Sequence, residues 1–137
     1  MILTKTTEYA VRVLTFMASQ NEDLFSAKYI HKQLNIPYKY LTRLMTDLAK
    51  HGCLSSIRGR QGGFKFTKKL SDISLAKIIE AVEGMDSFNA CILGFDECSS
   101  DNPCAMHYVW EKNKAEFIKT LENTTLDDIN HFKVTRF

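Results

Sequence analysis

One short segment, Arg-Gly-Arg-Gln-Gly-Gly at positions 58–63, restricts the fold of this 137-residue chain more than any other part of it. It separates two β-like runs, Cys53–Ile57 and Phe64–Thr67, and its glycines permit the tight reversal of a β-hairpin. A stretch with helical periodicity comes immediately before the first of these runs. Any fold of the chain must therefore place a short basic hairpin directly after a helix.

Two helices are predicted in the residues before the turn at Asn35–Pro37. Residues 5–19 form the first, because their apolar side chains recur at helical spacing. These side chains are Ala10, Val13, Leu14 and Met17. Ser26 is a suitable N-cap for the second helix, which carries Ile30 and Leu34 on one face.

A third helix is predicted to begin at Pro37, which suits the first helical position, and to stop at Gly52, a natural residue for the turn after a helix. Its inward face is apolar and consists of Leu41, Leu44, Met45 and Leu48. Three helices followed by a hairpin is the element order of a winged helix-turn-helix. We therefore expect a mainly α fold, with a winged helix-turn-helix DNA-binding domain in residues 1–84.

The outward face of the third helix and the tip of the hairpin are the predicted DNA-binding surfaces. Side chains on that helix face can donate hydrogen bonds to base edges and phosphates in a major groove. Arginines between glycines can reach phosphates or an A·T-rich minor groove, because glycine lets the backbone approach DNA closely. The residues concerned are Tyr38, Lys39, Thr42 and Arg43 on the helix, and Arg58, Arg60 and Gln61 on the hairpin. An ordinary solvent-exposed turn is the alternative interpretation of the hairpin.

The charge distribution agrees with a polyanion-binding part joined to a different part. Residues 1–84 hold 13 Lys or Arg against 7 Asp or Glu, whereas residues 85–137 hold 5 against 9. Within residues 28–69 there are 10 basic side chains and a single acidic one, Asp47. Such asymmetry favours a nucleic-acid partner, although a solvated basic face would have the same composition.

Three of the four cysteines gather in the region after a fourth predicted helix, which Ser74 caps and Gly84 ends. Cys91 and Cys98 lie in a polar loop, residues 85–103, and a long helix is predicted to start at Pro103 with Cys104 and His107 in its first turn. In a cytosolic chain, clustered thiols indicate metal or redox chemistry rather than a disulfide scaffold.

A Cys₃His donor set suits tetrahedral zinc or an iron–sulfur cluster. The spacing C-x6-C-x5-C-x2-H lacks the C-x2-C knuckles of common zinc sites, which disfavours zinc. A thiol switch without metal is the third possibility. Cys53, at the start of a β-like run, is expected to be a small buried hydrophobe.

Composition excludes several other classes of protein. Hydrophobic residues make up 45% and charged residues 25% of the chain, as in ordinary globular proteins. Arg12 interrupts the longest apolar run, Tyr9–Ala18, and the first residues lack the pattern of a signal peptide. We therefore expect a cytoplasmic protein that needs no membrane. An enzyme is not expected, because no cysteine has an evident base partner.

Several motifs in this order resemble the Rrf2 family of bacterial transcription regulators. They are Leu3-Thr4-x4-Tyr9-Ala10-Val11-Arg12, Ile36-Pro37-x2-Tyr40-Leu41, Arg58-Gly59-x2-Gly62-Gly63-Phe64, and the helix from Ile73-Ser74-Leu75 to Glu83-Gly84 followed by three cysteines. The resemblance covers nearly the whole chain. It implies a homodimeric regulator of transcription, in which the helix from Pro103 to about Asn123 is the dimerisation element within residues 104–137.

The resemblance also implies a ligand set. Cys91, Cys98 and Cys104 match the cysteines that hold iron in cluster-binding members, as a [2Fe–2S] or a [4Fe–4S] cluster. IscR-like members use a histidine placed as His107 is, whereas NsrR-like members recruit an acidic residue of the partner subunit at the position of Glu8. Both candidates are present, so the fourth ligand stays open.

The expected function is that of a repressor whose binding to a double-stranded DNA operator responds to nitric oxide, redox state or iron supply through this cluster. A zinc-based or thiol-based regulator is one alternative. A regulator controlled by a protein partner, as in CymR-like relatives, is another.

Overall fold

The computed structural model describes residues 3–131, and its fold is mainly helical, as predicted. The elements, in chain order, are α1 (Lys5–Ser19), α2 (Ala27–Leu34), α3 (Tyr38–Lys50), β1 (Leu54–Ile57), β2 (Gly63–Phe66), the 3-10 turn η1 (Leu70–Asp72), α4 (Leu75–Val82), the 3-10 turn η2 (Asp86–Phe88), α5 (His107–Asn123) and α6 (Leu126–His131). Within this described range, every helix is too short or too polar to cross a bilayer.

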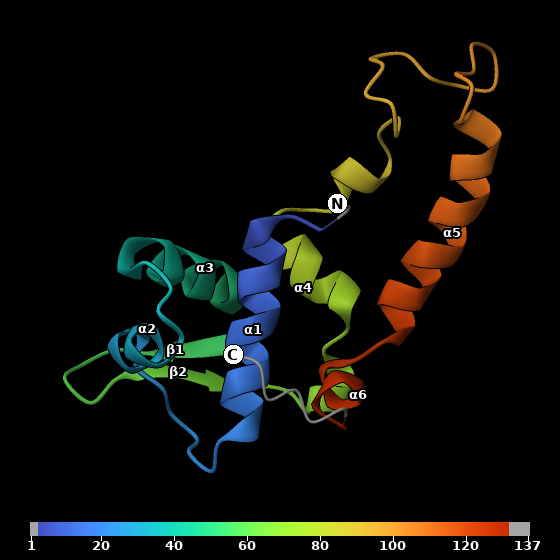
Figure 1. The fold of residues 1–137 in the computed structure, drawn as a ribbon. Coiled ribbons are helices and arrows are strands. Elements are labelled where there is room, and N and C mark those ends of the chain that lie inside the picture. Colours follow the sequence, from blue (N-terminus) through green and yellow to red (C-terminus); the bar gives the residue numbers. More distant parts are fainter. Residues whose placement is uncertain (1–2, 132–137) are drawn as a thin grey trace.

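Helix α1 runs through the middle of the helical body, with α3, α4 and α6 packed against it (Figure 1). Its side chains Ala10, Val13 and Leu14 are completely buried, which confirms the inward face predicted from helical spacing. The inward face of α3 is buried in the same core, as predicted. The hydroxyls of Thr4 and Thr7, at the start of α1, donate to the carboxylate of Glu83 just after α4, so these two helices are joined at that end.

The hairpin forms a wing beside α3. Strands β1 and β2 pair antiparallel, with a register that runs from Leu54↔Phe66 to Ile57↔Gly63. A third short piece of chain joins them, because the backbones of Phe25 and Phe64 exchange hydrogen bonds of 2.9 and 2.7 Å. Helices α1 to α3 with this small sheet make a winged helix-turn-helix, as the element order predicts.

An arm extends away from this body (Figure 1). The loop after η2 leads outward, and α5 returns along the arm to the body, where α6 closes the fold. The return is fixed by backbone hydrogen bonds from Leu126 to Ile73 (2.8 Å) and from Leu75 to Thr124 (2.9 Å). Leu126 is fully buried in the main core. The C-terminal part of α5 is therefore anchored to the body, whereas its N-terminal part holds the cysteine loop.

Several element boundaries differ from those predicted. Pro37 is the N-cap of α3 rather than its first residue, since its φ and ψ of −52° and 132° are not helical. Strand β1 begins one residue later than predicted and ends at Ile57 as predicted, whereas β2 begins and ends one residue earlier than predicted. Helix α5 starts at His107 and not at Pro103, because residues 104–107 first make a turn in which the His107 N–H donates to the Cys104 carbonyl at 3.1 Å. Helix α6 was not predicted; the tail that follows it, residues 132–137, lies outside the described residues.

Candidate metal centre and DNA-binding surface

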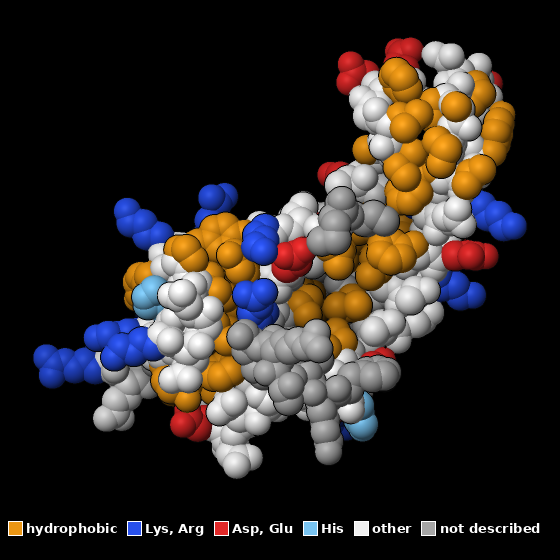
Figure 2. All heavy atoms as spheres, viewed as in Figure 1, with side chains coloured by type: hydrophobic (Ala, Val, Ile, Leu, Met, Phe, Trp, Pro, Cys, Tyr) orange, Lys and Arg blue, Asp and Glu red, His pale blue; other side chains and the backbone are white. Residues whose placement is uncertain are grey.

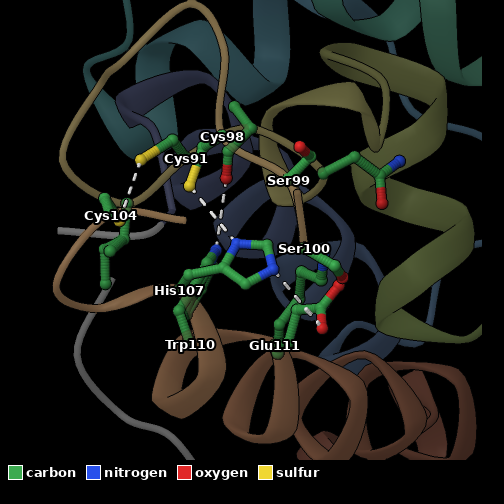
Figure 3. Close-up of a pocket in the computed structure, with 12 residues that line it drawn as sticks. Cys91, Cys98, Ser99, Ser100, Cys104, His107, Trp110 and Glu111 are labelled. Carbon is green, nitrogen blue, oxygen red and sulfur yellow. Dashed lines mark hydrogen bonds and ion pairs between the residues drawn. The ribbon is translucent and has the colours of Figure 1, made fainter. Parts of the chain in front are cut away.

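Three cysteine side chains converge at the outer end of the arm. The Sγ atoms of Cys91, Cys98 and Cys104 all lie within 4.8 Å of one another, and those of Cys91 and Cys104 are 3.6 Å apart. Figure 3 shows these thiols turned toward one another above the first turn of α5. The cavity beside them measures about 280 Å³. The structure thus brings together the three cysteines that the sequence predicts to be ligands, and all three are free thiols.

Turns in the loop account for this convergence. Gly94 has a φ of +81°, a value that favours glycine, and its N–H bonds the Cys91 carbonyl at 3.0 Å. Further along, Ser99 and Asn102 exchange backbone hydrogen bonds. The chain reverses at each of these turns. The three thiols, which are separated by six and five intervening residues, therefore face one point.

His107 completes the donor set. Its Nδ1 atom lies 3.3 Å from the Sγ of Cys98, and its side chain is buried although it belongs to the first turn of α5. Nε2 is buried without a hydrogen-bond partner, and the nearest carboxylate oxygen, of Glu111, is 3.7 Å away. A buried imidazole nitrogen with no partner is costly, and it needs an explanation in the chemistry of the site.

The thiols of the pocket ionise differently. Burial raises the pKa of Cys91, but hydrogen bonds from the backbone of Phe95 and Leu93 outweigh it. Together with hydrogen bonds from the neighbouring thiols, they lower the pKa to about 7. For Cys98, a backbone hydrogen bond from Cys104 lowers the pKa, whereas burial and the adjacent thiols raise it, and the net direction is upward. Because metal ligands must be thiolates, one thiol here is prepared for binding and another must lose its proton on binding.

The residues present fit a metal centre. Three sulfur donors and one imidazole make the Cys₃His set that zinc and iron–sulfur centres both accept. The half-buried pocket lacks any carboxylate among its closest donors, which favours soft, thiophilic metals over calcium or magnesium.

Two neighbours of the pocket were not predicted from the sequence. The indole N–H of Trp110 donates to the Ala90 carbonyl at 3.2 Å and so fixes the residue before Cys91 against α5. Glu111 lies one helical turn after His107. The positions i+3 and i+4 after a predicted histidine ligand are the signal that could have identified them.

Glu8 lies elsewhere in the chain. It belongs to the first turn of α1, forms an ion pair of 3.3 Å with Lys5, and is not among the residues that line the cysteine pocket. Any contact between Glu8 and the cysteines would therefore come from a second subunit.

The predicted DNA-binding residues lie at the opposite end of the molecule from the cysteines. Lys and Arg side chains gather over the end of the body that carries α2, α3 and the wing, whereas hydrophobic side chains line the arm (Figure 2). Tyr38, Lys39 and Arg43 are exposed on α3. Thr42 is half-buried and its hydroxyl donates to the Lys39 carbonyl at 2.9 Å.

The wing and α3 enclose an open groove. Arg58 lines it from the wing, and Thr46 and Lys50 line it from α3. Arg60 and Gln61 are exposed at the wing tip. Lys50 was not singled out from the sequence, although it is one of the ten basic side chains within residues 28–69. Arg43 itself lies on the other flank of α3, in a cavity shared with Tyr40 and Asp47.

Apolar side chains are exposed along the arm. Phe95, Tyr108 and Val109 are 59%, 63% and 55% exposed. The helix that is expected to mediate dimerisation is divided: Val109 is exposed, but Leu121 is buried in its own chain against Ile79 and Phe88, and Phe117 packs beside it. The N-terminal half of α5, which is the half farther from the body, therefore presents the exposed apolar surface.

Comparison with known proteins identifies related sequences. A family model, Rrf2, described as an iron-dependent transcriptional regulator, matches residues 3–131. The HTH-type transcriptional regulator NsrR of Oceanobacillus iheyensis is 32% identical over 131 residues, covering 94% of this chain and 89% of that protein. The regulator of the same name from Bacillus licheniformis is 32% identical over 133 residues, covering 94% and 92%.

Solved structures have the same fold. The structure of T. potens IscR matches with a TM-score of 0.72 and 28% identity, covering 96% of this chain and 87% of that one. CymR (YrzC), the global cysteine regulator of B. subtilis, matches with a TM-score of 0.75, covering 95% and 96%. At 24% identity, this second likeness bears on the fold alone.

Proposed function

Because the chain belongs to the Rrf2 family of transcriptional regulators, we propose that an iron–sulfur cluster held by Cys91, Cys98, Cys104 and His107 controls its binding to operator DNA. The family and its HTH-type relatives are DNA-binding regulators of transcription and not enzymes. The proposal concerns the cofactor, its ligands and the switch.

One observation carries the proposal: three thiols and an imidazole that are scattered over 17 positions converge at one pocket. Within it they form two close pairs, Cys91 with Cys104 at 3.6 Å and Cys98 with His107 at 3.3 Å. Two thiolates bound at about 2.3 Å to one tetrahedral metal lie about 3.8 Å apart. Two pairs of donors suit the two metal atoms of a [2Fe–2S] cluster, and we favour this nuclearity over [4Fe–4S].

His107 is the fourth ligand that the geometry favours. Its ring already contacts Cys98 within the same chain, whereas Glu8 is paired with Lys5 in α1. A role for Glu8 would need the α1 of a partner subunit to reach the cysteine loop.

The proposed switch links this pocket to the DNA-binding end. When bound, the cluster supplies a redox-active centre that can respond to nitric oxide, oxidants or iron supply. The loop holds its cysteines beside α5, and the C-terminal end of α5 packs on α4 and leads into α6 in the core. Loading the pocket changes its charge and packing, and this change biases the position of α5 against the body.

In a homodimer formed through the N-terminal half of α5, a shift of α5 would change the distance between the two winged helices. Two winged helices must meet successive major grooves about one DNA turn apart to read a palindromic operator. The exposed Tyr108 and Val109 on α5, with Phe95 on the loop, are the apolar surface that supports such an interface. A protein partner on the same surface is the alternative occupant.

The cluster is tested by an anaerobic ultraviolet–visible spectrum of the purified protein together with iron and sulfide analysis. We expect a coloured protein, bleached in Cys98→Ala and unchanged in Cys53→Ala, the matched control for loss of a thiol outside the pocket. Loss of colour in His107→Ala but not in Glu8→Ala would support the favoured ligand set. A colourless wild-type protein, after anaerobic reconstitution, would refute the iron–sulfur proposal.

Zinc is the second candidate, because all three sulfur atoms lie within 4.8 Å and could close on one tetrahedral ion. Elemental analysis of the same sample separates the two: zinc at one equivalent without sulfide would identify a colourless, oxygen-indifferent centre.

A further inference from the structure

The Nε2 atom of His107, which is buried without a hydrogen-bond partner, lies near the carboxylate of Glu111. We infer that Glu111 is a positioning residue: its carboxylate accepts a hydrogen bond from the Nε2–H group of His107 and thereby directs the Nδ1 lone pair at the cysteine pocket. This inference rests on the proposed role of His107 as a ligand. It assigns a residue on α5 that lies outside the Cys₃His set.

Only one neutral form of the imidazole suits the surroundings of both ring nitrogens. A neutral histidine carries its proton on one nitrogen and a lone pair on the other. With the proton on Nδ1, the buried Nε2 lone pair would face the Glu111 carboxylate oxygen at 3.7 Å, which is electrostatically unfavourable. With the proton on Nε2, this N–H points at an acceptor, and Nδ1 is left as an acceptor 3.3 Å from the Cys98 sulfur.

The distance from Nε2 to the Glu111 carboxylate is only slightly longer than a hydrogen bond, and the Glu111 side chain can move to shorten it. A normal N–H···O hydrogen bond is at most about 3.2 Å long. The Glu111 side chain is 53% exposed, so rotation about its own bonds can shorten the 3.7 Å separation, whereas the buried His107 ring is held by its surroundings. The two residues are four apart on α5, the spacing that places side chains one above the other on a helix. Figure 3 shows the carboxylate beside the nitrogen that faces away from the cysteines.

The arrangement matches a general feature of metal sites. A ligating histidine usually donates its second N–H to a carboxylate or carbonyl, which fixes the tautomer and makes the ligand more basic. Loss of such an outer partner typically costs about 10–100-fold in metal affinity. Glu111 is the acidic residue among those that line this pocket.

The first test reads the tautomer in the metal-free protein. Long-range ¹H–¹⁵N spectra of histidine-labelled protein resolve the ring nitrogens, and the His107→Gln variant identifies the signals of His107 among the four histidines. We expect the Nε2–H form in the wild type and in Glu111→Gln, which keeps an acceptor oxygen. A mixture with the Nδ1–H form is expected in Glu111→Leu. Glu116→Leu, on an exposed part of α5, is the matched control and should leave the wild-type pattern intact.

The second test uses cobalt(II) alone, added to the metal-free protein without oxygen. We expect its affinity to fall about 10–100-fold in Glu111→Leu and to be unchanged in Glu116→Leu. A wild-type His107 in the Nδ1–H form, or an unchanged tautomer and cobalt affinity in Glu111→Leu, would overturn the inference. A protein that never assembles iron and sulfide but shows the expected tautomers would instead remove the iron–sulfur proposal and leave this assignment standing.

Discussion

At the scale of single residues, the wing depends on glycine at two positions where backbone approaches backbone. A Cβ atom on Gly62 would lie 2.1 Å from the Ile57 carbonyl oxygen, and one on Gly63 would lie 2.5 Å from that of Phe25. Both neighbours are main-chain atoms that cannot rotate away. The glycines therefore fix how closely the wing tip folds on β1 and how the wing joins the chain before α2.

Gly62→Ala should open the wing tip and destabilise the fold. We expect the free energy of unfolding to fall by about 1–3 kcal/mol, as for other substitutions that force backbone apart. Urea denaturation followed by circular dichroism measures this change. Gln61→Ala, at the exposed neighbouring position, should change it by less than about 0.5 kcal/mol. Equal stability of the two variants would mean that the tip does not require glycine.

The four thiols should react with iodoacetamide in a fixed order in the metal-free protein. Burial raises the pKa of Cys53, against smaller opposite effects of Lys68 and Lys77, so this buried thiol should react last. Cys91, with a pKa lowered to about 7, should react first near neutral pH, and its rate should rise as pH increases through that value. Peptide mass spectrometry of samples quenched over time gives the order. Rapid labelling of Cys53 would contradict its place in the core.

At the scale of elements, the sequence predicts helices well where one face is buried against the body. Helix α1 has the predicted bounds because its apolar period and its Thr4 cap act together. The start of α5 could not be predicted, since the turn at Cys104 is set by thiols that come from distant parts of the loop. Helix α6 was missed although Thr125 and Asp128 form a reciprocal cap, because only the contact of Leu126 with the core makes so short a helix stable.

In the candidate site, too, some residues are predictable from the sequence and others depend on contacts between distant parts of the chain. Cysteine and histidine spacing was enough to predict the pocket residues, because few other roles suit three cysteines and a histidine gathered within 17 positions. The spacing of Trp110 and Glu111 from His107 was an available signal, but their contacts with Ala90 and His107 depend on how the loop folds against α5.

The two elements that are predicted to contact DNA should contribute differently to binding. Arg43→Ala on α3 should alter sequence preference by about 1–3 kcal/mol if the arginine reads a base edge. Arg60→Ala on the wing should weaken all sequences alike and reduce the salt slope by about one unit, as for loss of a phosphate contact. Fluorescence anisotropy with specific and scrambled duplexes over a range of salt separates the two. A uniform loss in Arg43→Ala would show that α3 does not read bases through this residue.

At the scale of the whole molecule, the fold separates a basic end, which carries α3 and the wing, from a cysteine-bearing arm (Figures 1 and 2). The two ends are joined through the α4–α5 contact and the buried Leu126 of α6. Communication between them is therefore expected to depend on the position of α5 rather than on direct contact between cluster and DNA. The exposed apolar surface on the arm supports the proposal that a second copy of the chain packs against it.

Val109→Asp should weaken dimerisation, because it places a charge in the apolar surface of distal α5. We expect sedimentation velocity to show a dimer for the wild type and a shift toward monomer for the variant. Glu122→Ala, at an exposed position near the anchored end of α5, should leave the dimer unchanged. A wild-type protein that is monomeric at micromolar concentration would exclude a dimer through this face.

The most direct test of the central claim compares DNA binding with and without the metal centre. A duplex selected from random DNA by the wild-type protein is titrated anaerobically with cluster-loaded and cluster-free protein, alongside Cys98→Ala. We predict that loading changes the affinity of the wild type by about 10-fold or more, within the usual range of coupling between sites, and leaves that of Cys98→Ala unchanged. Equal affinities of loaded and cluster-free wild-type protein would contradict control of DNA binding by the cysteine pocket.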